Sequence, residues 1–339
     1  MRDFTCGLAT AIVLLAAPMS TARADATADF YARTTLTFYV GAGVAGGFDT
    51  YSRALMEYMP RHIPGNPTVV VKNMAGAGGV SAANYLFNVA PKDGATIGMP
   101  LSTIVISEVL TPKNVKYRSQ GFGWIGTVAT MTELLGVRSD SGVATIDDAR
   151  KKPLVIGSTS KLSQAHLQPA LVKALLGTQF RIVDGYKTST DVTLAMERGE
   201  VQGRTNPWDT WNLRPDLIKA GQIRFLVQFG PKIPELANVP GFSELVKTPQ
   251  ERALVDFMEL IQYIGRSVAA PPGIPNDRLA ALRKSFDDTL ADPQFIARMK
   301  SRNLDLNPRT GAALQSNIEG IMVSAPETAR ALKTALDLK

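Results

Sequence analysis

The sequence predicts an α/β protein of two domains, built from short strands that alternate with helices. Its 339 residues exceed what one hydrophobic core usually holds, because single cores rarely grow past roughly 250–300 residues. From Thr34 onward a β-rich run, a glycine- or serine-rich turn and a helical pattern follow one another repeatedly. This alternation is typical of a mainly parallel sheet with helices on its faces.

Composition and charge limit the classes of function. Hydrophobic residues make up 45% of the chain and charged residues 20%, which excludes a disordered, fibrous or polytopic membrane protein. The formal net charge is +7, but the longest basic run, Arg150-Lys151-Lys152, has no interleaved aromatic residues. We therefore expect no nucleic-acid partner, while the mildly basic surface would suit an anionic ligand.

The first 24 residues have the features of a secretory signal peptide. Arg2 precedes an apolar run over residues 8–19, and Ala22-Arg23-Ala24 has the small-x-small form that signal peptidase accepts. Cleavage after Ala24 would release a periplasmic protein, since no later stretch approaches 18 apolar residues. Cys6 lies in this leader, so we expect the mature chain to have neither a disulfide nor a thiolate metal site.

The first block of the chain predicts three strands separated by helices. The expected strands span residues 36–40, 68–71 and 95–99. The first helix would present an apolar face made by Tyr51, Leu55, Tyr58 and Met59. Asp49 or Thr50 can cap its start, and a second helix is expected over residues 82–89.

A second block, from about Val128, follows the same plan. Its expected strands span residues 154–156, 180–183 and 223–228, the last of which could return the chain to the first block. Pro169 suits a first helical turn, which leaves open whether the helix around it starts at Ser163 or at Gln168. Further helices are expected over residues 192–198, 277–290, 293–300, 311–322 and 327–338.

The chain lacks the local signals of metal or nucleophilic catalysis. Its two histidines, His62 and His166, are far apart, and there is no H-E-x-x-H, C-x-x-C, G-x-S-x-G or Walker motif. We therefore expect no metal site and no catalytic residues of these types.

Three glycine- or serine-rich turns indicate an anion-binding cleft instead. They span residues 41–49, 76–81 and 157–163, and each precedes a helix whose first N–H groups lack partners within the helix. Glycines also fit tight strand–helix corners without any ligand, so one such turn alone would decide little. Three of them in one chain favour a ligand cleft.

Residues 41–46 also match the G-x-G-x-x-G pattern of a dinucleotide-binding loop. The acidic residue that binds the ribose of NAD is missing after the next strand, where Lys72 and Asn73 stand. These two residues could tolerate the 2′-phosphate of NADP. An exported NADP-dependent oxidoreductase therefore remains an alternative of a different class.

Several segments, in order along the chain, resemble one protein family. Residues 40–50 are similar to its strand and glycine-rich Asp loop, and VVVKNMAGAGG at 69–79 resembles its "VVVENRPGAGG" segment. Later matches are Pro91-Lys92-Asp93-Gly94, Gly157-Ser158 with His166-Leu167, Gly185-Tyr186-Lys187, residues 197–203 and the proline signatures at 234–240 and 270–275. The family is that of the extracytoplasmic substrate-binding proteins of tripartite tricarboxylate transporters, the TctC or Bug family. The resemblance covers about Leu36 to Pro308.

This resemblance implies a type II periplasmic-binding-protein fold, in which two α/β lobes close around a ligand cleft. Residues 25–127 and 228–339 would form lobe 1, and residues 128–227 lobe 2. The protein would be a monomer without cofactor or catalytic activity. It would capture a small, often carboxylated solute and deliver it to membrane transport subunits. A signalling receptor with the same fold is not distinguished from such a transport receptor by sequence.

The resemblance also implies the ligand contacts. In lobe 1 they would be Ala45, Gly46, Gly47 and Phe48, with Asp49 bracing the loop, then Gly76, Ala77, Gly78, Gly79, Ser102 and Thr103. In lobe 2 they would be Ser158, Thr159, Ser160, Gln164, Ser189, Thr190 and Asn206.

The sequence departs from the family pattern at several positions near the expected site. Val44-Ala45 replaces a proline, and Gln202 and Arg204 replace an acidic and an apolar residue. If Lys161, Lys187 or Arg204 points inward, a carboxylate gains a charge-assisted bond. Trp208 and Trp211 would belong either to the core or to the cleft wall.

Overall fold

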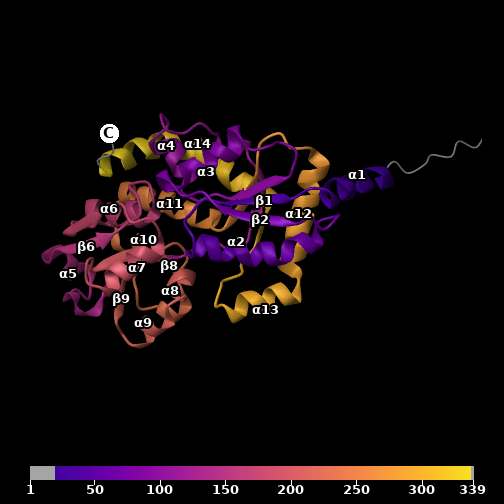
Figure 1. Ribbon diagram of the computed structural model, residues 1–339. Helices are drawn as coiled ribbons and strands as arrows, with labels where there is room; N and C mark the ends of the chain where they lie inside the picture. Colours follow the sequence, from indigo (N-terminus) through magenta and orange to yellow (C-terminus); the bar gives the residue numbers. More distant parts are fainter. Residues whose placement is uncertain (1–19, 337–339) are drawn as a thin grey trace, which may run out of the picture.

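In a computed structural model that describes residues 20–336, the chain forms two α/β lobes joined by crossing segments (Figure 1). Residues 1–19 of the expected signal peptide lie outside the described residues. Helix α1 (Ser20–Ala32) extends across the expected cleavage point at Ala24. Among the described residues, no helix is long and apolar enough to cross a membrane.

Lobe 1 is built on a six-stranded sheet with the strand order β11-β4-β10-β3-β1-β2. Its strands are β1 (Leu36–Val40), β2 (Val69–Asn73), β3 (Thr96–Met99), β4 (Gly123–Thr127), β10 (Ser267–Ala270) and β11 (Arg309–Thr310). β1 pairs in parallel with β2 and β3, whereas β10 runs antiparallel between β3 and β4. The three strands expected in the first block are thus confirmed, and they are the parallel part of the sheet.

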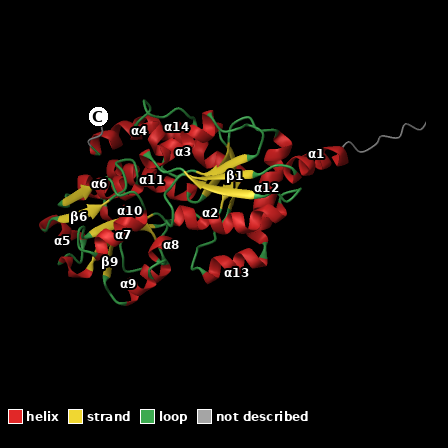
Figure 2. Cartoon of the chain, in the orientation of Figure 1, coloured by secondary structure: helices red, strands yellow, loops and turns green. Residues whose placement is uncertain are grey.

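Helices cover both faces of this sheet (Figures 1 and 2). One face packs against α2 (Gly47–Tyr58) and α12 (Asn276–Ala291), and α13 (Pro293–Ser301) packs on these two helices. The other packs against α3 (Val80–Asn88), α4 (Ile104–Leu110) and α14 (Gly311–Ala335). Alternate residues of β1, namely Leu36, Phe38 and Val40, are fully buried against Tyr51 and Leu55 of α2.

The long helix α14 differs from the two helices expected over residues 311–322 and 327–338. The sequence places Pro326 near the expected break, yet the helix runs continuously from Gly311 to Ala335. Ile318, Ile321, Ala329 and Leu332 are all buried, so its apolar stripe continues past the proline. Burial of this stripe therefore outweighs the helix-breaking tendency of proline.

Lobe 2 is built on a five-stranded sheet with the order β7-β6-β8-β5-β9. Its strands are β5 (Glu133–Arg138), β6 (Leu154–Gly157), β7 (Phe180–Val183), β8 (Gly203–Pro207) and β9 (Ile223–Phe229). Its helices are α5 (Ile146–Lys151), α6 (Gln164–Leu176), α7 (Ser189–Glu197), α8 (Trp208–Trp211), α9 (Pro215–Lys219) and α10 (Phe242–Leu245). β6 pairs in parallel with β7 and β8, and β5 is antiparallel to β8 and β9.

The structure shows where the helix around Pro169 begins, which the sequence leaves open between Ser163 and Gln168. Ser163 is the N-cap and Gln164 the first helical residue, so Pro169 lies inside the helix. Of the two expected starts, the structure has the one at Ser163.

The second crossing between the lobes comes later than expected. Residues 223–228 do not return the chain to lobe 1, because β9 pairs with β5 at the edge of the second sheet and extends to Phe229. The chain then passes through α10 and α11 (Pro249–Ile264) before β10 joins the first sheet. We therefore propose that the boundary placed at residue 228 moves to the segment after Phe229.

The two segments in which the chain crosses between the lobes, one after Thr127 and one before Ser267, lie side by side. The N–H of Arg266 donates to the carbonyl of Ala129 at 2.8 Å, and the N–H of Val128 donates to the carbonyl of Arg266 at 3.0 Å. This short pairing connects the two sheets.

Candidate functional site

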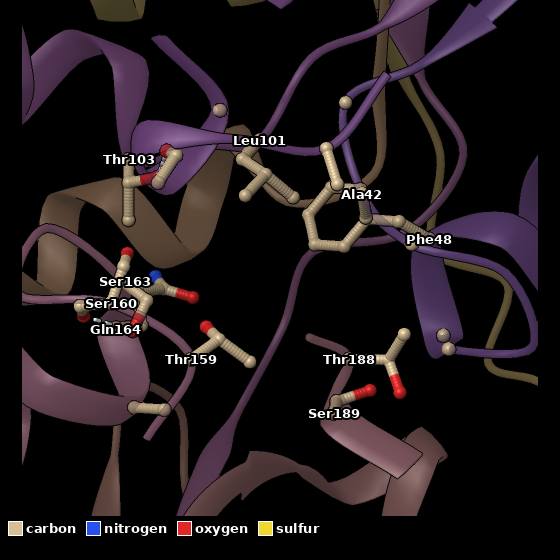
Figure 3. A pocket seen from close by; sticks show the side chains of 18 of the residues that line it. Ala42, Phe48, Leu101, Thr103, Thr159, Ser160, Ser163, Gln164, Thr188 and Ser189 are labelled. Carbon is tan, nitrogen blue, oxygen red and sulfur yellow. Dashed lines mark hydrogen bonds between the residues drawn. The ribbon is translucent and has the colours of Figure 1, made fainter. Parts of the chain in front are cut away.

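A cavity of about 440 Å³ lies between the two lobes. It is lined by the turns that follow β1, β2 and β3 in lobe 1 and β6, β7 and β8 in lobe 2. The carboxyl ends of parallel strands are the usual place for a ligand in α/β folds. Figure 3 shows Ala42, Phe48, Leu101 and Thr103 facing Thr159, Ser160, Gln164, Thr188 and Ser189 across this cavity.

Most of the expected ligand contacts lie on the wall of this cavity. They are Gly46, Gly47, Phe48, Gly76, Ala77, Gly78, Gly79, Ser102, Thr103, Thr159, Ser160, Gln164, Ser189 and Asn206. They come from both lobes and from segments far apart in the chain. Their assignment as ligand contacts remains a proposal.

Four expected residues lie behind the wall or beside it. Asp49 accepts hydrogen bonds from the Ala45 N–H and from Asn73 Nδ2, both at 2.9 Å, so it fixes the loop from behind. Thr190 Oγ1 donates to the Ala45 carbonyl across the lobe interface at 3.1 Å. Ser158 is buried, and its hydroxyl lies 3.0 Å from Ser163 Oγ. These residues shape the loops instead of facing the cavity.

The turn after β1 leaves bare backbone at the start of α2. Gly46 is the N-cap, and no side chain caps the helix. The expectation that Asp49 or Thr50 caps this helix is therefore wrong, because both residues lie within its first turn. The positive end of the helix dipole consequently faces the cavity without a competing side chain.

The backbone conformation of the turn after β2 requires small residues. Gly76, Ala77, Gly78 and Gly79 all have positive φ angles, of 146°, 47°, 64° and 92°. Residues with larger side chains are strained in this region, so small residues are needed for the chain to enter α3 by this path.

The glycines of lobe 1 also bring the two lobes into contact. A Cβ atom at Gly43 would lie 2.6 Å from Thr188 Cγ2, and one at Gly46 would lie 2.8 Å from Ser189 Oγ. A Cβ atom at Gly78 would lie 2.9 Å from the backbone of Leu162. The lobes are therefore closed on the cavity, and small residues permit this closure.

The cavity wall includes charged residues that the sequence did not assign as contacts. They are Glu133 at the start of β5, Arg204 in β8 and Arg266 at the second crossing, together with Lys187. Of the three basic residues expected near the loops, Lys161 is exposed and does not line the cavity. Glu133 and Arg266 lie outside the glycine- and serine-rich turns, so no local pattern pointed to them.

Arg204 is almost completely buried, and its guanidinium is held by lobe 2 itself. Its Nη1 bonds to the Ser189 carbonyl and, at 2.5 Å, to Thr193 Oγ1, while its Nη2 donates to Asn206 Oδ1 at 2.8 Å. Burial lowers the pKa of Arg204 to about 10. The guanidinium thus remains charged at neutral pH and gives this wall of the cavity a positive potential.

The two tryptophans differ in their surroundings, and neither lines the cavity. Trp211 is buried, and its Nε1 donates to the Leu134 carbonyl at 3.3 Å. Trp208 is half-buried and packs edge-on against Phe225. Both belong to the packing of lobe 2.

Burial gives Glu133 an unusual protonation state. Only 3% of its surface is exposed, and burial raises the pKa of its carboxyl to about 8. The folded protein therefore keeps this proton between about pH 5 and 8, where the unfolded chain has lost it. The free energy of unfolding should fall as the pH rises through this window, by at most about 1.4 kcal/mol per pH unit.

Glu133→Gln should remove this contribution. The difference in unfolding free energy between Glu133→Gln and wild type should grow from pH 5 to pH 8, in favour of the variant. Denaturant unfolding at several pH values measures this difference. A constant difference across the window would show that Glu133 titrates normally.

The comparison with known proteins defines the family. Residues 53–318 match the family described as "Tripartite tricarboxylate transporter family receptor". The chain belongs to this family. The family that the sequence motifs indicate is thus confirmed.

Several solved structures have the same fold as this chain. A periplasmic binding protein, BugD, has a TM-score of 0.72 at 21% identity, over 91% of this chain and 99% of that chain. A Rhodopseudomonas palustris protein solved with adipate has a TM-score of 0.71 at 21% identity, over 90% and 98% of the two chains. MatC from Rhodopseudomonas palustris, with bound malate, has a TM-score of 0.70 at 18% identity, over 88% and 99%. The expected two-lobed binding-protein fold is therefore confirmed.

Proposed function

We propose that this family member is a periplasmic receptor, with residues 1–24 as its signal peptide, that captures a small organic carboxylate between its two lobes. It delivers this solute to the membrane subunits of a tripartite tricarboxylate transporter and catalyses no reaction on it. The protein acts as a monomer and needs no cofactor.

The observation that carries this proposal is the closed cavity with small residues and helix N-termini on its wall. The starts of α2, α3, α6 and α7 all lie at the cavity, and they come from both lobes. Their N–H groups favour a negatively charged group, and Arg204 adds a buried positive charge. The adipate and malate bound by the two structural neighbours are carboxylates of a size that suits such a cavity.

The oxidoreductase alternative has less support from the loop geometry. Asn73, at the position of the ribose-binding residue, donates to the Ala42 carbonyl and to Asp49 Oδ1. Lys72 is exposed and does not line the cavity. The loop that matches G-x-G-x-x-G is instead held against lobe 2, where a dinucleotide would need space.

Thermal unfolding of the purified protein against a ligand panel tests the proposal. The panel contains mono- and dicarboxylates, amino acids, neutral metabolites and NADP. A ligand at 100 times its dissociation constant should stabilise the fold by about 2.7 kcal/mol, which raises the midpoint visibly. A shift with NADP alone would contradict the proposal and favour the oxidoreductase.

An uptake assay separates transport from signalling. Cells that lack this protein should fail to accumulate the radiolabelled carboxylate identified by the panel, and expression of the wild-type protein should restore accumulation. Unchanged uptake in such cells would favour a signalling receptor with the same fold.

A further inference from the structure

One carboxyl group on the cavity wall, that of Glu133, is buried without a partner among the described residues. Glu133 lies at the start of β5, beside Pro207 and Phe229 of the neighbouring strands. It is nearly completely buried and lines the cavity. Within residues 20–336, no group of the protein makes a hydrogen bond or an ion pair with its carboxyl. A buried carboxyl without a partner is costly, so Glu133 at this wall indicates a partner supplied by the ligand.

The positive groups near Glu133 make their hydrogen bonds with other residues, and the buried Nε of Arg204 has no partner among the described residues. Arg266 and Arg204 are close enough to lower the pKa of Glu133, and Asp209 is close enough to raise it. Arg266 pairs with Asp209 at 2.8 Å, and Arg204 bonds to the Ser189 carbonyl, Thr193 and Asn206. Glu133 therefore offers an acceptor oxygen to whatever occupies the cavity.

We propose that Glu133 selects organic acids that carry a hydrogen-bond donor, a hydroxyl or an ammonium group, in addition to their carboxylate. This inference rests on the proposed function, because it assumes that a carboxylate occupies the cavity. The ligand's carboxylate faces the helix N-termini, and its donor group faces Glu133. An acid of the same skeleton without the donor leaves Glu133 unpaired, and a site built to pair with a donor discriminates strongly against such an analogue.

The protonation of Glu133 distinguishes the two kinds of donor. Burial raises the pKa of this carboxyl, so it is largely neutral in the absence of a ligand at pH 7. A neutral carboxyl accepts a hydrogen bond from a hydroxyl without a change in charge. An ammonium group instead favours the ionised form, so its binding releases a proton from Glu133.

The test uses three ligand series with matched skeletons. They are propionate, lactate and alanine; succinate, malate and aspartate; and glutarate, 2-hydroxyglutarate and glutamate. Calorimetric titration of the full protein should show that, in at least one series, the hydroxy or amino acid binds at least tenfold more tightly than the unsubstituted acid. In Glu133→Leu, which cannot accept a hydrogen bond, this ratio should fall to about one.

Glu133→Gln separates the two donors. The amide oxygen still accepts a hydrogen bond, so a preference for the hydroxy acid should persist. Because the negative charge is lost, binding of an amino acid should weaken at least tenfold. Glu259→Gln is the matched control, since Glu259 also has a carboxyl with a raised pKa but does not line the cavity. It should leave every ratio unchanged.

Two results would overturn the inference. The first is that the wild-type protein binds the unsubstituted acid as tightly as the hydroxy and amino acids in every series that it binds. The second is that the wild-type ratio of affinities persists in Glu133→Leu. Glu133→Ala replaces the leucine variant if circular dichroism shows that the latter does not fold. A protein that binds no carboxylate of the thermal-unfolding panel would contradict the proposed function as well, whereas binding without discrimination within these series would contradict this inference alone.

Discussion

Gly47→Gln should abolish carboxylate binding, with a loss of affinity of at least 100-fold, while the protein remains folded. Gly47 is the first residue of α2 and is buried where the two lobes meet. A Cβ atom at this position would collide with Thr210 Oγ1 and lie 2.6 Å from Arg266 Nη2. The glutamine side chain would also cover the N–H groups at the start of α2. Lobe closure and the anion site are therefore both lost.

Titration calorimetry with the best ligand of the panel measures this loss. Gly320→Gln is a suitable control, because Gly320 is a helical glycine in α14 where an added Cβ atom has nothing within 4 Å. This control should bind like wild type. Wild-type affinity in Gly47→Gln would place the ligand elsewhere in the molecule.

Asp209→Ala should destabilise the fold by about 3–5 kcal/mol, because it leaves a buried guanidinium without its counter-charge. Asp209 lies in α8 of lobe 2, and Arg266 lies at the second crossing between the lobes. Their side chains are 4% and 1% exposed, with Nη2 2.8 Å from Oδ1. The guanidinium of Arg266 also stacks 4.2 Å from the ring centre of Phe48 in lobe 1. This ion pair therefore holds α8 of lobe 2 against the second segment that crosses between the lobes and against α2.

Denaturant unfolding measures the effect of Asp209→Ala. Asp288→Ala serves as the control, since Asp288 forms an exposed pair with Lys284 on α12. Exposed pairs contribute little, so this variant should unfold close to wild type. Equal effects of the two substitutions would mean that the Arg266–Asp209 pair does not hold the lobes together.

Much of the fold follows from local sequence patterns. The parallel strands β1, β2, β3, β6 and β7 are short runs rich in apolar residues, and all of them lie within a residue or two of the expected bounds. β9 is recognisable as a strand, but the sequence leaves open whether it returns the chain to the first block, and the structure places it in the second sheet. Which sheet a strand joins depends on contacts with distant residues, here with β5, and a single sequence carries no local signal of such pairing.

The candidate site could likewise be predicted from the sequence only in part. The turns at 41–49, 76–81 and 157–163 could be found because small residues before a helix form a recognisable pattern. Glu133 and Arg266 could not be found in this way, since each is a single charged residue, the first residue of β5 and the residue before β10 respectively. Only the three-dimensional structure brings them to one cavity and shows that they are buried. The role of Asp209 likewise depends on a partner 57 positions away.

Small-angle X-ray scattering with and without a saturating carboxylate tests most directly whether the two lobes close on the solute. The radius of gyration should decrease when the ligand binds to wild type, because the closed arrangement brings Gly43 and Gly46 against Thr188 and Ser189. Gly47→Gln should show no such decrease at the same ligand concentration. An unchanged radius of gyration in wild type, under conditions where calorimetry shows saturation, would contradict capture by lobe closure.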